Sequence, residues 1–131
     1  AAQIEATEGQ LKARQSAPCQ AMARRLGAGR QAFLDAVGFI AGASRSRPNA
    51  TYAGSVPYLM LTGIVVSGWQ MARALLVAED RLAAGEDVAF MQAKIATCHF
   101  YADHILNKAP GLRDSIVDGA DSVTALALES F

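Results

Sequence analysis

The sequence predicts an all-α fold, an up-and-down antiparallel helical bundle with three long helices plus shorter terminal helices. Alanine is abundant, β-branched residues are thinly spread, and glycine and proline punctuate long stretches with helical periodicity. Residues 51–72 carry no charged side chain, which is typical of a helix surrounded by other helices. The segments between the periodic stretches are short, and short connections favour antiparallel neighbours.

The overall composition limits the size of the fold and the choice of partners. A chain of 131 residues fits one domain, so we expect a single helical-bundle domain over residues 1–131. Twelve basic and twelve acidic side chains give a formal charge of zero, which provides no field that attracts nucleic acid or an anionic membrane. We therefore expect neither partner. A cytoplasmic location is expected because we recognise no signal segment.

The first long helix is predicted from Ala17 to Ala43. Its apolar side chains recur at spacings of three, four and seven residues, which keeps one helical face apolar. These side chains are Met22, Leu26, Phe33, Val37 and Ile40. Residues 1–16 are expected to form a linker or a short helix, with helical spacing from Ile4 to Arg14.

The second long helix is predicted from Val56 to Ala84, after a loop that runs from Ser44 to Gly54. Ser55 is expected to be its N-cap, with Pro57 in the first turn, where a missing amide hydrogen costs little. Gly85 is the expected C-cap, because glycine readily takes the left-handed conformation that closes a helix.

The charge-free run within this helix has two interpretations. About 20 apolar residues suffice to cross a bilayer, so the run is long enough to be a membrane anchor. Small and polar residues make it less apolar than a lipid-facing segment, and we favour a buried helix of a soluble bundle. These residues are Gly54, Ser55, Gly63, Ser67, Gly68 and Gln70.

The third long helix is expected to be capped by Asp87 and to end or kink at Pro110, because proline lacks the amide hydrogen that a helix interior uses. A short helix from about Gly111 to Val117 and a mostly apolar tail to Phe131 follow. The apolar side of the third helix consists of Phe90, Met91, Ile95, Cys98, Tyr101, Ala102, Ile105 and Leu106.

Three side chains near the end of the third helix could carry chemistry. His99 and Asp103 share a helix face, with His104 adjacent, so a carboxylate could orient an imidazole for proton transfer or metal binding. A metal site needs three or four convergent ligands, and residues 51–70 of the facing helix include no Glu, Asp, His or Cys. We interpret the pair as a hydrogen-bonded pair at a helix surface. A stand-alone helical binding or phosphotransfer module that uses these three residues is the alternative function.

Two further patterns suggest ligands but have structural explanations that we favour. Gly27, Gly29 and Ala32 have the spacing of a dinucleotide-binding loop, yet they lie in a predicted helix and do not follow a strand. Serine and arginine alternate at residues 44–47 and could hold a phosphate, but we expect a solvated loop.

The remaining notable side chains are expected in the core. Cys19 and Cys98 form no Cys-x-x-Cys motif, so we expect reduced, buried thiols. An aromatic and sulfur-rich group in the second long helix is more typical of core packing than of a cofactor site. This group consists of Tyr58, Met60, Trp69 and Met71.

Three stretches of the chain match one known domain. They are Val56–Leu59 with Gly63 and Gly68–Ala74, then Ala93–Thr97 with Phe100–Leu106, and finally Gly119–Val123. Together they resemble the extra C-terminal domain of bacterial acyl-CoA dehydrogenases, in the long subgroup that is similar to methylmercaptopropionyl-CoA dehydrogenase. The resemblance covers most of residues 50–131.

The resemblance implies a C-terminal fragment of a longer flavoprotein oxidoreductase of fatty acid metabolism, and a chain that begins at Ala1 agrees with this. In that family a glutamate removes the α proton of an acyl-CoA and FAD takes a hydride from the β carbon, giving a 2-enoyl-CoA. Both groups are held upstream of the matched segment. We therefore assign no catalytic, cofactor-binding or metal-binding residue and expect the fragment alone to be inactive. The expected partners are the catalytic core of the parent enzyme and further copies in a homo-oligomer.

Overall fold

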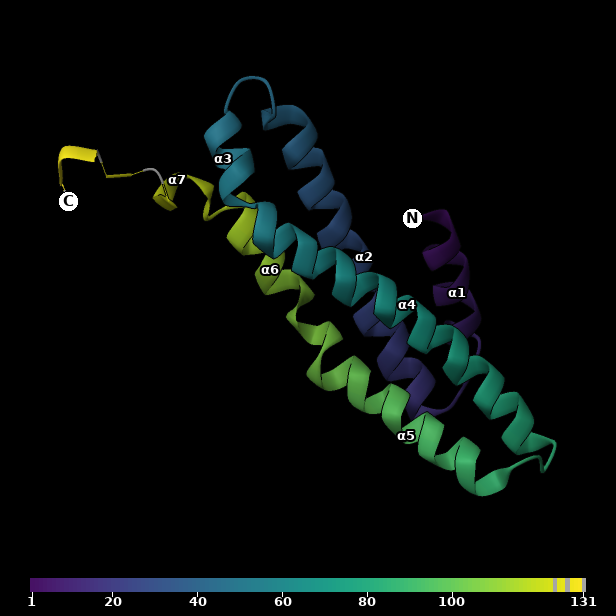
Figure 1. Ribbon diagram of the computed structural model, residues 1–131. Helices are drawn as coiled ribbons and strands as arrows, with labels where there is room; N and C mark the ends of the chain where they lie inside the picture. The colour runs from purple at the N-terminus through teal and green to yellow at the C-terminus, as the bar shows by residue number, and fades with distance from the viewer. Residues whose placement is uncertain (124, 127, 131) are drawn as a thin grey trace.

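Three long rods lie side by side in the computed structural model (Figure 1). The first is α2 (Ala17–Ala43), the second is α4 (Ser55–Ala83), and the third consists of α5 (Val88–His104) continued by α6 (Ala109–Val117). Each rod contacts both of the others, and successive rods run in opposite directions (Figure 1). The predicted all-α bundle of three long helices is therefore confirmed. The structure describes residues 1–123, 125, 126 and 128–130.

Shorter helices complete the described part of the chain. They are α1 (Ala2–Lys12), α3 (Pro48–Ala53), α7 (Ala120–Val123) and the 3₁₀ turns η1 (Leu106–Lys108) and η2 (Leu128–Ser130). Helix α1 packs against α2 and α4, so the expected linker or short helix in residues 1–16 is a helix. Helices α3 and α7 contact each other at one end of the bundle (Figure 1). The predicted apolar tail to Phe131 lies partly outside the described residues.

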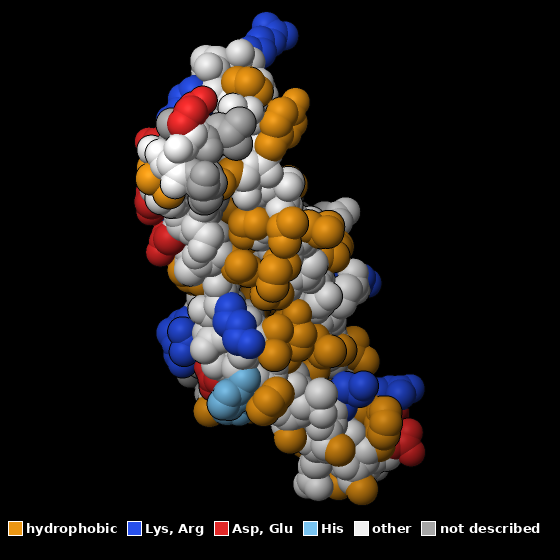
Figure 2. Space-filling model, turned by 60° about the vertical axis from the view of Figure 1, so that its left-hand side comes forward, with side chains coloured by type: hydrophobic (Ala, Val, Ile, Leu, Met, Phe, Trp, Pro, Cys, Tyr) orange, Lys and Arg blue, Asp and Glu red, His pale blue; other side chains and the backbone are white. Residues whose placement is uncertain are grey.

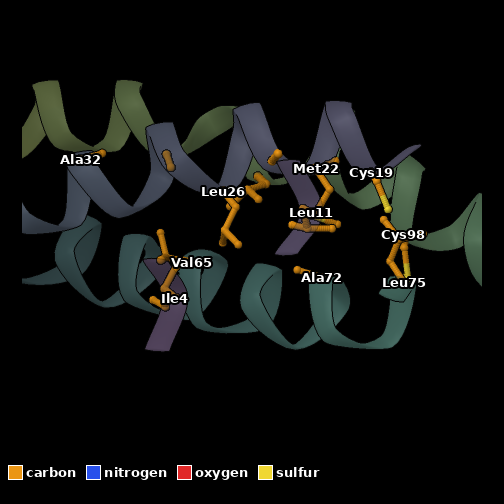
Figure 3. Close-up of a cluster of buried hydrophobic side chains, with 14 of the residues drawn as sticks. Ile4, Leu11, Cys19, Met22, Leu26, Ala32, Val65, Ala72, Leu75 and Cys98 are labelled. Atoms are coloured by element: carbon orange, nitrogen blue, oxygen red, sulfur yellow. The ribbon is translucent and has the colours of Figure 1, made fainter. Parts of the chain in front are cut away.

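The core lies along the axis between α1, α2, α4 and α5, as Figure 3 shows. Side chains of different helices meet there without contact with solvent, and the two cysteines lie within the same cluster. Close packing of this kind supplies most of the stability of helices in proteins. The largest fully buried side chains are Leu11, Met22, Leu26, Leu61, Leu75, Leu106 and Ile116.

A buried ionic contact attaches α1 to α2. The Glu8 carboxylate accepts hydrogen bonds from Lys12 Nζ at 2.6 Å and from Arg30 Nε at 3.2 Å, and the Glu8 side chain is 8% exposed. Burial by itself would raise the pKa of Glu8, but the two cationic donors outweigh burial and lower it below its usual value. A second tie runs to α4, where Trp69 Nε1 donates to Thr7 Oγ1 at 2.9 Å.

The predicted loop from Ser44 to Gly54 contains a helix, α3, and that part of the prediction is wrong. Pro48 occupies the first position of α3, where its fixed φ angle suits a helix, and Ala50 is buried. The predicted N-cap is also wrong, because Ser55 is the first residue of α4 and Gly54 stands at the N-cap without a side-chain bond.

The turn between α4 and α5 is closed by backbone hydrogen bonds. Gly85 has φ of 75°, as predicted, although it lies one residue after the C-cap, Ala84. The amide of Gly85 donates to the carbonyl of Leu82, and the amide of Glu86 donates to the carbonyl of Arg81. These two bonds form the Schellman pattern of helix ends. Asp87 does occupy the N-cap of α5, but its φ is 44° and its side chain makes no capping bond.

The third rod breaks before Pro110 rather than at it. Helix α5 ends at His104, and Pro110 is the second residue of α6, where no helical partner is needed for its nitrogen. Leu106, which we expected inside a continuous helix, lies in η1 and is fully buried. Its side chain fills a socket between the backbones of Gly29 on α2 and Gly68 on α4. The absence of side chains at these glycines lets the three rods approach closely there.

Candidate interaction surface

One side of α4 is not covered by any other described element. Four large apolar side chains follow one another there at helical spacing, and we call them the α4 face: Val56, Leu59, Met60 and Val66. Leu59 is 72% exposed, and the least exposed of the four, Val66, is 45% exposed. Figure 2 shows hydrophobic side chains gathered in a band along one side of the molecule. Exposed apolar surface of this extent is typical of a protein or membrane contact.

The expectation that the charge-free helix is buried holds for only one of its sides. Leu61, Val65 and Leu75 are buried in the core, whereas the α4 face is open. Within the described part of the chain, α4 is also the single helix long and apolar enough to cross a membrane by length and composition. Only 33% of its most apolar 18-residue window is buried.

A groove of about 430 Å³ lies between α4 and α5, near the turn that joins them, and it is open along one side. Its apolar lining includes Val77 and Phe90, which are 57% and 60% exposed. Three cationic side chains, those of Arg73, Arg81 and Lys94, also line it, and no carboxylate does. Phe90 was expected on the apolar side of α5, and its exposure places it at the surface instead of the core.

The three residues singled out for chemistry form surface contacts. His99 Nε2 lies 3.3 Å from Asp103 Oδ2, and Arg25 Nε lies 3.4 Å from Asp103 Oδ1. The imidazole of His104 stacks on Phe100 instead, with 4.4 Å between the ring centroids. His99 and Asp103 are therefore brought together, but His104 does not join them. No group of three or more metal-binding side chains occurs among the described residues.

The glycine motif of α2 serves helix packing. Gly27 and Gly29 both lie within α2, as expected for a segment that is not a dinucleotide-binding loop. A Cβ at Gly27 would lie 2.9 Å from the carboxylate of Glu8, and one at Gly29 would lie 3.2 Å from Leu106. The two glycines, whose spacing resembles a ligand-binding loop, thus let α1 and η1 approach the backbone of α2 closely. Ala32 is buried in the core.

The other candidate residues are in structural contacts. Arg47 belongs to the segment 44–47, which could have held a phosphate, and it forms an ion pair with Asp121 of α7. Cys19 and Cys98 are fully buried, as expected, and burial raises the pKa of the Cys19 thiol to about 11. Trp69 packs on the core with Tyr58 and Met71 as expected, but Met60 is exposed on the α4 face.

Two features were missed in the sequence. The exposed α4 face could have been suspected, because Val56, Leu59, Met60, Gly63 and Val66 follow one helical side within a run that is apolar on every side. The cationic groove had no such signal, since its charges come from two helices that meet only in the folded chain.

Comparisons with known proteins identify the family. Residues 1–127 match the family described as acetyl-CoA dehydrogenase C-terminal like. The chain is 41% identical over 125 residues to 3-methylmercaptopropionyl-CoA dehydrogenase from Ruegeria pomeroyi. This match covers 95% of the chain but 21% of the relative, so the chain spans about a fifth of that protein's length. No solved structure matches the chain significantly. The chain therefore belongs to the family of acetyl-CoA dehydrogenase C-terminal-like domains.

Proposed function

We propose that this chain is the non-catalytic C-terminal domain of a longer bacterial acyl-CoA dehydrogenase and that its α4 face packs on the catalytic part of that polypeptide. The family match and the relative from Ruegeria pomeroyi support this class of enzyme. FAD and the acyl-CoA are bound by residues outside this chain. The flavin held there would supply a hydride acceptor, and a carboxylate of that part would take the α proton, so that an acyl-CoA would become a 2-enoyl-CoA. The enzyme acts in the cytoplasm as a homo-oligomer.

The α4 face is the observation that supports the packing. Its four side chains are between 45% and 72% exposed, and no charged residue interrupts them. Covering one such side chain contributes about 1–2 kcal/mol, because apolar area removed from water is worth about 25 cal/mol per Å². The match spans about a fifth of the relative, so most of such an enzyme lies outside this chain and can supply the covering surface.

A membrane is a poorer partner for this surface than protein. A bundle that crossed a bilayer would need apolar residues around its whole circumference. The exposed side of α2 instead carries Arg24, Arg25 and Asp35. Helix α4 presents a long charge-free side, which suits packing against one protein surface.

The test compares two double variants in the longer polypeptide that carries this domain. Leu59→Lys with Val66→Lys places two charges on the α4 face. We expect lower thermal stability, a changed oligomer size and reduced acyl-CoA turnover, because the charges would be buried against the catalytic part. The same double variant of the chain alone should unfold at an unchanged temperature, since both side chains are exposed there.

A matched control places the same two charges on α2. Leu34 and Val37 are 36% and 37% exposed, and Leu34→Lys with Val37→Lys should leave assembly and turnover unchanged. The proposal fails if the α4 variant of the longer polypeptide behaves like this control. It also fails if the chain binds lipid vesicles and the α4 variant abolishes that binding.

A further inference from the structure

The groove between α4 and α5 has an excess of positive charge. Of its three cations, Arg81 pairs with Glu86 at 3.3 Å. Arg73 and Lys94 have no carboxylate partner in the part of the chain that the structure describes. The chain as a whole is neutral, so this excess is local to the groove.

Aromatic rings hold the two unpaired cations in place. The guanidinium carbon of Arg73 lies 5.5 Å from the centroid of the Trp69 ring, and Lys94 Nζ lies 5.4 Å from that of Phe90. Such contacts orient a cation without neutralising its charge. Arg73 also donates a hydrogen bond to Gln70 Oε1 at 3.1 Å, and Gln70 lines the groove. Both cations therefore stand at the edge of the groove with their charge unneutralised.

Most of the remaining lining of the groove is apolar. Val77 and Phe90 are more than half exposed although they lie next to Ala78 and Met91, which are buried. These apolar residues come from both α4 and α5, which pack against each other there, and the groove is open along one side. An open trough of this kind fits side chains from the surface of another helix better than it fits a fully enclosed small molecule.

We infer that the α4–α5 groove receives an amphipathic, acidic helical segment from the catalytic part of the same polypeptide. An apolar side chain of that segment fills the space between Val77 and Phe90, and its carboxylates pair with Arg73 and Lys94. This inference rests on the proposed function, because it requires a catalytic part joined to the domain. Charge complementarity and the large share of the relative that lies outside the match support this occupant.

Zero-length cross-linking with a carbodiimide tests the inference, because this reagent joins a lysine amine directly to a carboxylate that contacts it. The chain has three lysines, Lys12, Lys94 and Lys108. Lys12 contacts Glu8 at 2.6 Å and provides an internal positive control. In the longer polypeptide we expect Lys94 to be linked to an Asp or Glu of the catalytic part. Lys108, which is exposed outside the groove, should give no such link.

Two variants show whether the link depends on the groove. Phe90→Ala removes an apolar anchor, and we expect it to lower the yield of the Lys94 link about tenfold, which corresponds to about 1.4 kcal/mol. Arg73→Glu should lower the yield by a similar factor, because it repels the same carboxylates. The Lys12–Glu8 link should be unchanged in both variants, which shows that the domain remains folded.

Several outcomes would overturn the inference. The first is that Lys94 forms no link, and the second is that Lys94 is linked to this domain in a second copy. The third is that no link forms and that added acyl-CoA protects Lys94 from chemical acetylation, which would make acyl-CoA the occupant of the groove. Isotope labelling of one copy distinguishes links within a polypeptide from links between copies. If the α4-face variants still disrupt the enzyme, the proposed function stands and only the groove inference fails. If neither the variants nor the cross-link shows contact, both fail.

Discussion

Replacing Gly68 by alanine tests the socket that joins the three rods. A Cβ at this residue would lie 2.9 Å from both methyl carbons of Leu106, closer than real Cβ contacts allow. Leu106 is fully buried, and its Cδ1 methyl also lies against Gly29, where an added Cβ would be 3.2 Å away. The leucine can therefore relieve the clash only by changing its rotamer or by displacing a rod.

Two opposing effects set the size of the change. Alanine is about 1 kcal/mol more favourable than glycine inside a helix, whereas overpacking a core costs about 1–3 kcal/mol. Gly63, on the same helix, has no atom within 4 Å of an added Cβ, so Gly63→Ala carries only the favourable effect. We expect Gly63→Ala to stabilise the chain by up to about 1 kcal/mol. Gly68→Ala should be less stable than Gly63→Ala by about 1–3 kcal/mol.

Urea unfolding of the chain, followed by circular dichroism, measures these differences. Leu106→Ala alone should cost about 2–5 kcal/mol because it opens a cavity. In the Leu106→Ala variant, Gly68→Ala should no longer lower the free energy of unfolding. The double-mutant cycle should therefore show a coupling of about 1–3 kcal/mol. Equal stabilisation by Gly63→Ala and Gly68→Ala, or zero coupling between residues 68 and 106, would refute the reasoning.

Three further predictions concern single side chains. Glu8→Gln should lower the free energy of unfolding by about 1–3 kcal/mol at pH 7, because Arg30 loses a buried anionic partner. The folded-state pKa of Glu8 is lowered, so this difference should be complete above about pH 4.5 and vanish as the pH falls through the folded pKa in acid titrations. Cys19 and Cys98 should not react with a disulfide reagent at pH 8 until denaturant unfolds the chain, because burial raises the pKa of both thiols. Ser16 Oγ accepts from the Cys19 amide at the start of α2, and Ser16→Ala should cost about 1 kcal/mol in thermal unfolding.

The long helices could be predicted because their signals are local. The bounds of α2 agree with the prediction from Ala17 to Ala43, since the apolar period and the residues at its ends lie within the segment itself. The six-residue helix α3 could not be predicted in the same way. A helix that short is not stable by propensity alone, and it forms here with Ala50 buried and with α7 packed against it.

The candidate surface was only partly visible in the sequence. The run without charges was evident, but it was interpreted as a buried helix of a soluble bundle, and the structure leaves Val56, Leu59 and Val66 exposed. Similarly, the break in the third rod was expected at Pro110 but lies at Ile105. There Leu106 leaves the helix and is buried against two glycines that are distant in the sequence.

The sequence by itself determined which segments form the long helices, that α4 carries no charge through Ala72, and which family the chain resembles. Periodicity, turn residues and motif identity are properties of neighbouring residues, so they can be read without coordinates. Only the tertiary structure decided that one side of α4 is uncovered and that Arg73 and Lys94 face one groove. Exposure and charge clustering depend on which rods lie next to each other, and those contacts join residues far apart along the chain.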